Sequence, residues 1–311
     1  MLAWMIYATL VAMALSAAAL FAEHAARHRR RPTRWPWMMA IVATVLLPIL
    51  IATISIRFPA LHGSAGTAVS VTPLALRDTT SVPLASKVID WSGTKPYTSS
   101  TWIDAILRDI WMASSFTLLL FLGLSTALLH RSKRAWTSGR LCGLPVLISE
   151  SAGPAVVGLI RSRIVVPAWL LHESDAQQQY VLAHEQSHLK ARDPLLVASA
   201  LMFLAAMPWS PLLWWQFHRL RCAIEVDCDR RVLHSGVDVG DYCETLIHVG
   251  ENQSEYIGAV TAMSESRSFL EQRIKIMLSK PKKWAGAFVR TGQRLPWHGG
   301  LCGTGYAARR A

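Results

Sequence analysis

The sequence predicts a mainly α-helical membrane protein, in which three transmembrane helices precede an α+β domain with a metal-binding helix. Composition is the first observation: hydrophobic residues make up 52% of the 311 residues and charged residues only 17%, which is more apolar than an ordinary soluble protein. The second observation is the motif His184-Glu-Gln-Ser-His188, which follows three long apolar segments. Thirteen tryptophans fit the membrane interfaces that this class implies.

Three apolar segments are predicted to span the membrane, at residues 2–22, 36–56 and 106–129. Each has about 20 residues or more, the length that a helix needs to cross the hydrocarbon core. The first segment lacks the basic start of a signal peptide, so we expect it to be retained. Residues 57–104 are polar and show no helical periodicity, which predicts an extracytoplasmic loop with little structure of its own. A membrane region is therefore predicted over residues 1–129.

The net charge of +12 is concentrated directly behind apolar segments. Residues 27–34 hold five arginines, and residues 131–140 hold four basic residues. Such clusters anchor the cytoplasmic ends of spans, so we expect a multi-pass protein of the inner (plasma) membrane with residues from 130 onward in the cytoplasm. The lipid bilayer thereby accounts for the basic charge, and no direct nucleic-acid partner is expected. Five scattered cysteines without a CxxC pair predict reduced thiols.

A second domain is predicted over residues 130–280, followed by a basic tail, residues 281–311, that is expected to be disordered. Two β-branched runs between Pro145 and Pro167 predict short strands. The free edge of such a strand can pair with an extended peptide, or the sheet can simply support the helix that follows. That helix is expected to begin near Ser174 or Asp175, either of which can serve as its N-cap.

The motif from His184 to His188 predicts a catalytic zinc site. Its four-residue spacing places both imidazoles on one face of a helix, where they can bind one Zn²⁺. Glu185 lies one residue further along, within reach of a zinc-bound water as general base. The alternative is a solvated helix that happens to bear two histidines. Arg192 and Asp193, just past the motif, either join this site or form surface charge.

A third zinc ligand is expected on the helix after the motif, where four residues offer donor atoms. At about 100° per residue, Asp227 lies on the opposite face from Glu225, whereas Cys228 and Asp229 fall within about 60° of it. A cysteine ligand would make the site softer than is usual for peptide hydrolysis. The short Asp229 side chain is better placed behind a histidine than on the metal. We therefore predict the metal ligands His184, His188 and Glu225, with Asp229 as their support.

Residues 195–217 form an apolar stretch that Pro208-Trp-Ser-Pro211 interrupts. As one straight helix it could cross a bilayer. That path would place Glu225 across the membrane from His184 and His188, and one zinc ion cannot be bound from both sides. We therefore predict a membrane-associated helical hairpin that returns to the same face. The alternative, a fourth span, would leave the site without Glu225.

Four segments carry a family resemblance: AHEQSHLKARDPL, PWSPLLWW, EVDCDRRVL and SRSFLEQRIKIML. In this order they resemble the BlaR/MecR-type antirepressor membrane metallopeptidases, over roughly residues 1–280. The resemblance implies a gluzincin-like cytoplasmic zinc peptidase domain embedded in the membrane, and a protein substrate such as a transcriptional repressor. It also implies the same site: zinc ligands His184, His188 and Glu225, catalytic base Glu185 and supporting Asp229.

The sequence thus predicts a membrane-embedded zinc endopeptidase that acts in signal transduction. A housekeeping peptidase that clears damaged membrane proteins and a non-cleaving, zinc-binding signalling scaffold are the alternatives. The best-known members of the family continue into another span and an extracellular penicillin-binding sensor domain, a pattern that does not follow residue 280 here. We therefore expect any signal to arrive through residues 57–104, the membrane or a partner.

Overall fold

A computed structural model describes residues 1–29, 31–53, 101–150, 152–256 and 267–278 of the chain. The described part is mainly helical with one small sheet, which confirms the predicted mixture of elements. Most of the predicted extracytoplasmic loop and the whole of the predicted tail, residues 281–311, lie outside the described residues.

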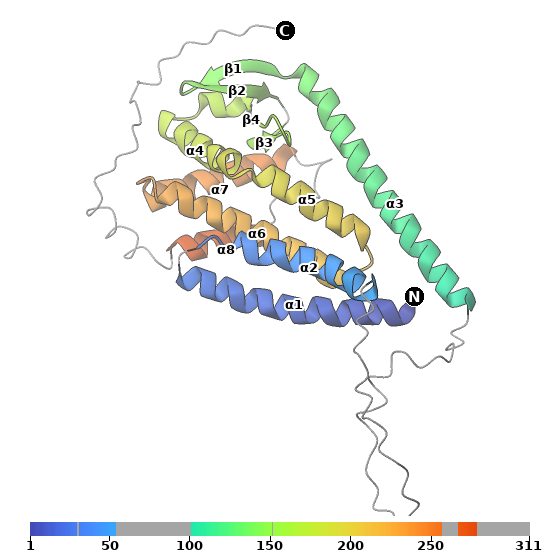
Figure 1. Cartoon of the computed structure of the whole chain (residues 1–311). Helices are drawn as coiled ribbons and strands as arrows, with labels where there is room; N and C mark the ends of the chain where they lie inside the picture. Colours follow the sequence, from blue (N-terminus) through green and yellow to red (C-terminus); the bar gives the residue numbers. More distant parts are fainter. Residues whose placement is uncertain (30, 54–100, 151, 257–266, 279–311) are drawn as a thin grey trace, which may run out of the picture.

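Three long apolar helices make up the N-terminal part: α1 (Leu2–His28), α2 (Arg34–Thr53) and α3 (Thr101–Ser132). All three are long and apolar enough to cross a membrane. Helices α1 and α2 pack side by side, whereas α3 stands apart from them over most of its length and contacts α5 (Figure 1). The prediction of a loop as far as residue 104 was wrong at its end, because α3 already begins at residue 101. Asp104 lies in the first turn of α3, where a carboxylate complements the helix dipole, and pairs with the amino terminus of Met1 at 3.1 Å.

A four-stranded sheet follows a short 3₁₀ turn, η1 (Lys133–Ala135), and has the order β1-β2-β4-β3. Strands β2 and β4 are parallel, and the two edge strands are antiparallel to their neighbours. The bounds are β1 (Thr137–Leu141), β2 (Leu144–Ser149), β3 (Ala155–Val157) and β4 (Arg163–Pro167). The first strand was not predicted: its sequence TSGRL has no β-branched apolar run, and its pairing with β2 is what makes it a strand.

One face of the sheet packs on the helix that carries the zinc motif. Alternate residues of β2 and β4 point to that face, as the two-residue period of a strand requires. They form one core with the helix: Val146, Ile148, Ile164, Val166, Val181 and Leu182. The sheet therefore holds this helix in place from one side, while other helices cover its opposite side (Figure 1).

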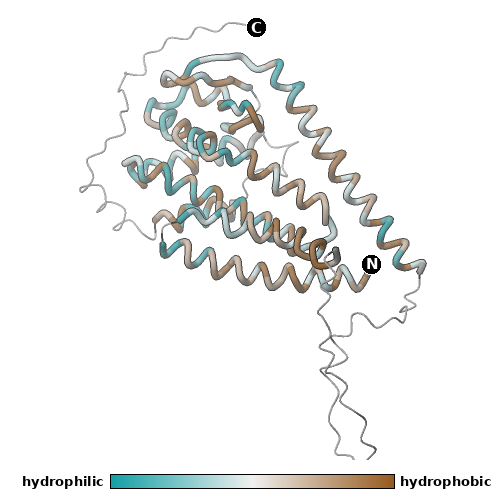
Figure 2. Tube along the Cα trace, viewed as in Figure 1, coloured by the Kyte–Doolittle hydropathy of each residue, from teal (hydrophilic) through white to brown (hydrophobic). Residues whose placement is uncertain are grey.

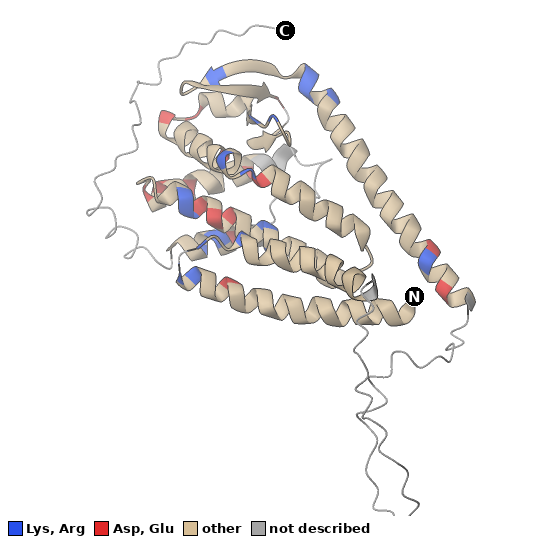
Figure 3. Ribbon diagram, in the orientation of Figure 1, with Lys and Arg blue, Asp and Glu red and all other residues tan. Residues whose placement is uncertain are grey.

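In the described part of the chain, six helical elements follow the sheet. Their bounds are η2 (Ala168–His172), α4 (Asp175–Ala191), α5 (Asp193–Ala206), α6 (Pro211–Leu233), α7 (Val239–Tyr256) and α8 (Arg267–Leu278). Hydrophilic residues prevail in α4 and α7, whereas α2 and α5 are apolar over most of their length (Figure 2). Figure 3 shows the matching distribution of charge, with long uncharged stretches in α1, α2 and α5.

Helices α5 and α6 form the predicted hairpin. Helix α5 has 14 residues and is therefore about 21 Å long, too short to cross a hydrocarbon core of about 30 Å. The chain breaks after Ala206 and restarts at Pro211, with Ser210 as N-cap accepting from the backbone of Leu213. Helix α6 then runs back along α5, so both flanks of the stretch 195–217 lie at the same end of the hairpin (Figure 1).

The N-terminal helices and the hairpin share one hydrophobic core. It contains Trp37 and Ile41 of α2 together with Leu204 of α5 and Leu213 of α6. A buried polar cluster lies within it: Gln216 of α6 donates to Ser16 at 2.9 Å and to Thr44 at 3.1 Å. Residues of the predicted membrane region 1–129 and of the predicted domain 130–280 are therefore packed as one body around α6.

The hairpin makes a prediction about labelling from the two sides of a membrane. In a cysteine-free variant with a single cysteine at Lys190 or at His234, both exposed, an impermeant thiol reagent should label both positions from the same side. The reason is that α5 is too short to carry the chain across. Labelling of intact and opened vesicles provides the measurement. Labelling from opposite sides would show that residues 195–217 form a full span.

Candidate metal centre

Helix α4 presents the two motif histidines to α6. Of the two predicted N-cap residues, Ser174 takes the position: its side chain accepts from the backbone of Gln177, whose own side chain returns to the backbone of Ser174. From this capping box the helix runs to Ala191, which places His184 and His188 one turn apart near its C-terminal end. Arg192 then adopts a left-handed φ of 54° and ends the helix.

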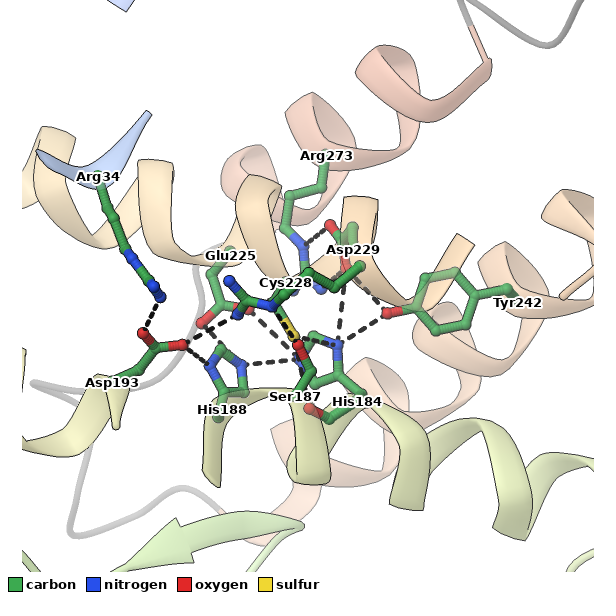
Figure 4. A network of polar contacts seen from close by, with 11 residues as sticks. Arg34, His184, Ser187, His188, Asp193, Glu225, Cys228, Asp229, Tyr242 and Arg273 are labelled. Atoms are coloured by element: carbon green, nitrogen blue, oxygen red, sulfur yellow. Dashed lines mark hydrogen bonds and ion pairs between the residues drawn. The ribbon is translucent and has the colours of Figure 1, made fainter. Parts of the chain in front are cut away.

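Three donor groups converge where α4 meets α6 (Figure 4). The Nε2 atoms of His184 and His188 lie 3.2 Å apart. One carboxylate oxygen of Glu225 lies 3.4 Å from Nε2 of His184, and the other lies 3.7 Å from Nε2 of His188. In a tetrahedral site with metal–ligand bonds of about 2.0–2.1 Å, donor atoms are separated by roughly 3.3 Å. These residues thus have the spacing and the donor chemistry of a His₂Glu zinc site.

The outward nitrogen of His184 is held by a buried relay. Its Nδ1 lies 2.8 Å from the hydroxyl of Tyr242, which donates to Asp229 at 2.9 Å. Asp229 in turn accepts two hydrogen bonds from the guanidinium of Arg273, at 2.7 and 2.8 Å. The predicted supporting residue Asp229 is therefore next to the site, but it reaches the ring mainly through Tyr242, since its direct distance to Nδ1 is 3.7 Å.

The outward nitrogen of His188 is held by Asp193. Nδ1 of His188 lies 2.9 Å from one carboxylate oxygen of Asp193, whose side chain is 3% exposed. Arg231 donates to the same oxygen at 3.2 Å, and Arg34 donates to the other oxygen at 2.6 Å. Of the two readings left open for Asp193, membership of the site is the one that the structure supports. Each imidazole thus points Nε2 toward the metal position and Nδ1 toward a protein partner, as in most metal sites.

Cys228 offers a competing donor from the same helix as Glu225. Its Sγ and the histidine nitrogens all lie within 4.8 Å of one another. Yet Sγ lies 3.4 Å from Nδ1 of His184 and 4.0 Å from Nε2, so it is closer to the nitrogen that faces Tyr242. Glu225 faces both Nε2 atoms, so the described residues offer two candidates for a third ligand, Glu225 and Cys228.

Asp227 points away from this centre, as its position on α6 predicts. Its carboxylate accepts from the backbone and hydroxyl of Thr33 at 3.0 and 3.1 Å, and from the backbone of Arg34 at 3.1 Å. Asp227 thereby caps the N-terminus of α2 from a different helix.

Charge in the site favours a cation between the two imidazoles. Burial opposes protonation of His184, but the adjacent Cys228 sulfur and Glu225 carboxylate raise the pKa of His184 to about 10. Burial also opposes the charge on Glu225, yet His188 and Arg273 hold the pKa of its carboxyl well below the usual range. Glu225 is therefore ionised and able to bind a metal. Because a liganding imidazole must be neutral, zinc binding would release protons from the histidines.

Glu185 lies beside this centre in a buried position, with 6% of its surface exposed. Burial raises the pKa of its carboxyl, and the charge of Glu225 adds to the effect, while the two imidazoles oppose it. A raised carboxyl pKa lies closer to neutral pH, which suits a general base.

Comparison with protein families identifies the chain. The family model described as BlaR1 peptidase M56 matches residues 4–277, which is most of the chain. The chain belongs to the M56 peptidase family. Its members are membrane metallopeptidases of signal transduction, which agrees with the three apolar helices and with a donor cluster around His184 and His188 that could hold a metal ion. The family resemblance read from the motifs is thereby confirmed.

Curated relatives of this M56 peptidase match a shorter stretch. Proteins described as methicillin resistance mecR1 protein, from Staphylococcus aureus and Staphylococcus epidermidis, are each 27% identical to the chain over 135 residues. The match covers 41% of this chain and 23% of each relative, so the chain corresponds to less than a quarter of their length.

Four residues of the site were not singled out from the sequence: Arg34, Arg231, Tyr242 and Arg273. Arg273 left a signal, since it lies at helical spacing between Phe269 and Met277 on the apolar face of α8 and is 2% exposed. A charged residue on a buried face requires a partner, and Arg273 has two, Asp229 at 2.7 Å and Glu225 at 3.3 Å. Tyr242 left no comparable signal, because its role depends on the packing of α7 against α4.

The third ligand can be tested by comparing Glu225→Ala with Cys228→Ala. Glu225→Ala should lose most of its zinc, because only two imidazoles then remain at the metal position. Cys228→Ala should keep wild-type zinc. Metal analysis of the full-length proteins purified in detergent provides the measurement. Loss of zinc from Cys228→Ala together with its retention in Glu225→Ala would assign the third ligand to the cysteine.

The relay behind His184 makes a separate prediction. Tyr242→Phe and Asp229→Ala should each weaken zinc binding by about 10–100-fold, the usual effect of removing a partner behind a metal ligand. Tyr180→Phe is the matched control, because the Tyr180 hydroxyl faces Asp241 at 3.5 Å instead of a motif histidine. Zinc affinity is measured by competition with a chelator. Equal zinc affinities for Tyr242→Phe and Tyr180→Phe would show that the hydroxyl of Tyr242 does not support His184.

Proposed function

We propose that this M56 peptidase is a membrane-embedded zinc endopeptidase that transduces a signal by cleaving a cytoplasmic regulatory protein, such as a transcriptional repressor. The observation that carries the proposal is the convergence of His184, His188 and Glu225, with the buried Glu185 beside them. Three protein ligands leave a fourth position for water, as a catalytic zinc site requires. A protein substrate follows from the peptidase family, and a repressor follows from the resemblance to antirepressor peptidases.

The proposed reaction is hydrolysis of a peptide bond. When bound, zinc supplies a Lewis acid that polarises the scissile carbonyl and acidifies a water molecule. Glu185 would accept a proton from the attacking water as the water oxygen bonds to the carbonyl carbon, and would donate that proton to the amine nitrogen as the C–N bond breaks. Tyr242 and Asp193 keep the two imidazoles turned with Nε2 toward the metal position.

The sheet provides a place for an extended substrate. Strand β4, which directly precedes the motif helix, pairs with both β2 and β3, so the predicted free edge does not lie on that strand. Among the described strands, β3 is the edge strand next to it, packs against α4, and has no strand partner on its outer side. An extended substrate can add to this edge as a further strand, which would align its backbone along the helix that bears the metal ligands.

The proposed topology has α1, α2 and α3 as membrane spans and α4 to α8 in the cytoplasm, with the α5–α6 hairpin entering the membrane without crossing. Apolar length supports the three spans. The basic residues that follow α1 and α3 support the cytoplasmic side, because positive charge is retained there (Figure 3). The plasma membrane is then the proposed location, and the bilayer a structural partner of the peptidase.

Catalysis is tested with Glu185→Gln. This variant should keep its zinc, since Glu185 is not a ligand, and should lose about 10²–10⁴-fold in cleavage rate, the usual effect of removing a general base. Purified protein in detergent is assayed for zinc and for cleavage of an unfolded protein or of its own chain. Glu244→Gln, at an exposed position of α7, is the matched control. Equal cleavage by Glu185→Gln and wild type would contradict the proposed mechanism, and cleavage by neither would favour the scaffold function.

A further inference from the structure

Arg34 connects the start of α2 to the metal centre (Figure 4). It is the first residue of that helix, and its side chain is only 12% exposed. Its guanidinium donates to Asp193 at 2.6 Å, and these two residues are 159 positions apart in the sequence. Helix α2 is one of the three candidate spans, so the contact joins a span directly to the chain segment that follows the zinc motif.

Asp193 divides its two oxygens between different partners. One oxygen accepts a hydrogen bond from Arg34. The other oxygen accepts one from Arg231 and lies 2.9 Å from Nδ1 of His188. Arg231 is further fixed by donating to Ser187 on α4 at 2.6 Å. Without Arg34, nothing described holds the first oxygen, and the carboxylate can rotate about its Cβ–Cγ bond toward Arg231. The hydrogen bond that orients the ring of His188 would then lose its fixed geometry.

The N-terminus of α2 is itself held against α6. Asp227 caps the helix through Thr33 and the backbone of Arg34, and Asp227 lies only two residues from Glu225. Further along, Thr44 and Gln216 join the same two helices within the shared core. Helix α2 is therefore anchored to α6 at two points, and the position of Arg34 is set by how α2 lies on α6.

We propose that Arg34 is a positioning residue of the metal centre: by fixing Asp193 it fixes His188, so that zinc affinity depends on how α2 is placed against α5 and α6. This inference rests on the proposed zinc function of His184, His188 and Glu225. It goes further by making a span contribute to the metal site. A change in the position of α2 would then alter metal binding without any contact between α2 and the metal.

The experiment measures zinc affinity of full-length protein in detergent by chelator competition, first in three single variants. Arg34→Ala should bind zinc about 10-fold more weakly, at the lower end of the range for partners behind metal ligands. Arg34→Lys should restore most of the affinity, because only one guanidinium nitrogen contacts Asp193. Arg219→Ala is the matched control: it breaks another partly buried ion pair of the same bundle, that of Arg219 with Glu23, without touching the site, and should bind zinc as wild type does.

A double variant shows whether Arg34 acts through Asp193. Asp193→Asn should weaken zinc binding by itself, and adding Arg34→Ala to it should cause no further loss. Additive losses would overturn the proposed route. Wild-type affinity in Arg34→Ala would overturn the positioning role and leave the zinc function intact. An equal loss of affinity in Arg34→Ala and Arg219→Ala would also overturn the positioning role, because it would reflect general loosening of the bundle. A wild-type protein that binds no zinc would instead contradict the proposed function itself. If Arg34→Ala does not fold, the zinc affinity of Arg34→Gln is measured in its place and compared with the same variants.

Discussion

The contact of one carboxylate on α6 with two imidazoles on α4 is the constraint on which the rest of the structure depends. His184 and His188 are set one turn apart by helix geometry alone, but Glu225 lies 37 residues beyond His188 and reaches them only if the chain returns. The return is made by the break after α5, the capped restart at Ser210 and the antiparallel course of α6. A single site thus determines the path of the whole segment between its ligands.

The residues around His184 and His188 place several charged side chains in a buried region, among them Asp193, Asp229 and Arg273. Each of these three side chains is paired with an opposite charge, which offsets the free-energy cost of burying it. A buried carboxylate or guanidinium without a partner is strongly destabilising. Asp229 meets Arg273 through two hydrogen bonds, and Asp193 meets Arg34, Arg231 and His188. Such pairs add little stability compared with apolar packing of the same volume. Their presence is better explained by what they hold, which is the orientation of the imidazole rings of His184 and His188.

The sequence predicted the parts of this site that depend on local spacing. The one-turn spacing of His184 and His188 and the N-cap at Ser174 follow from residues within one or two turns of each other. Helical angles also placed Asp227 away from Glu225, as the cap on α2 shows. Tyr242 could not be foreseen, because its contact with His184 arises from the packing of α7 on α4. Strand β1 was missed for the same reason, since pairing with β2 creates it.

Helix α6 links the N-terminal helices to the candidate metal centre. Its first part packs against α1 and α2, and its later part faces the histidines of α4. Near its beginning, Gln216 forms hydrogen bonds with Ser16 and Thr44 inside an apolar bundle, where a polar contact has no water to compete with it. Nine residues later the same helix carries Glu225 to the metal centre, a distance of about 13.5 Å along its axis. The two positions are joined by the continuous hydrogen-bonded turns of α6. The packing of α1 and α2 on one end of α6 and the geometry of the ligands at the other end are therefore not independent properties of this chain.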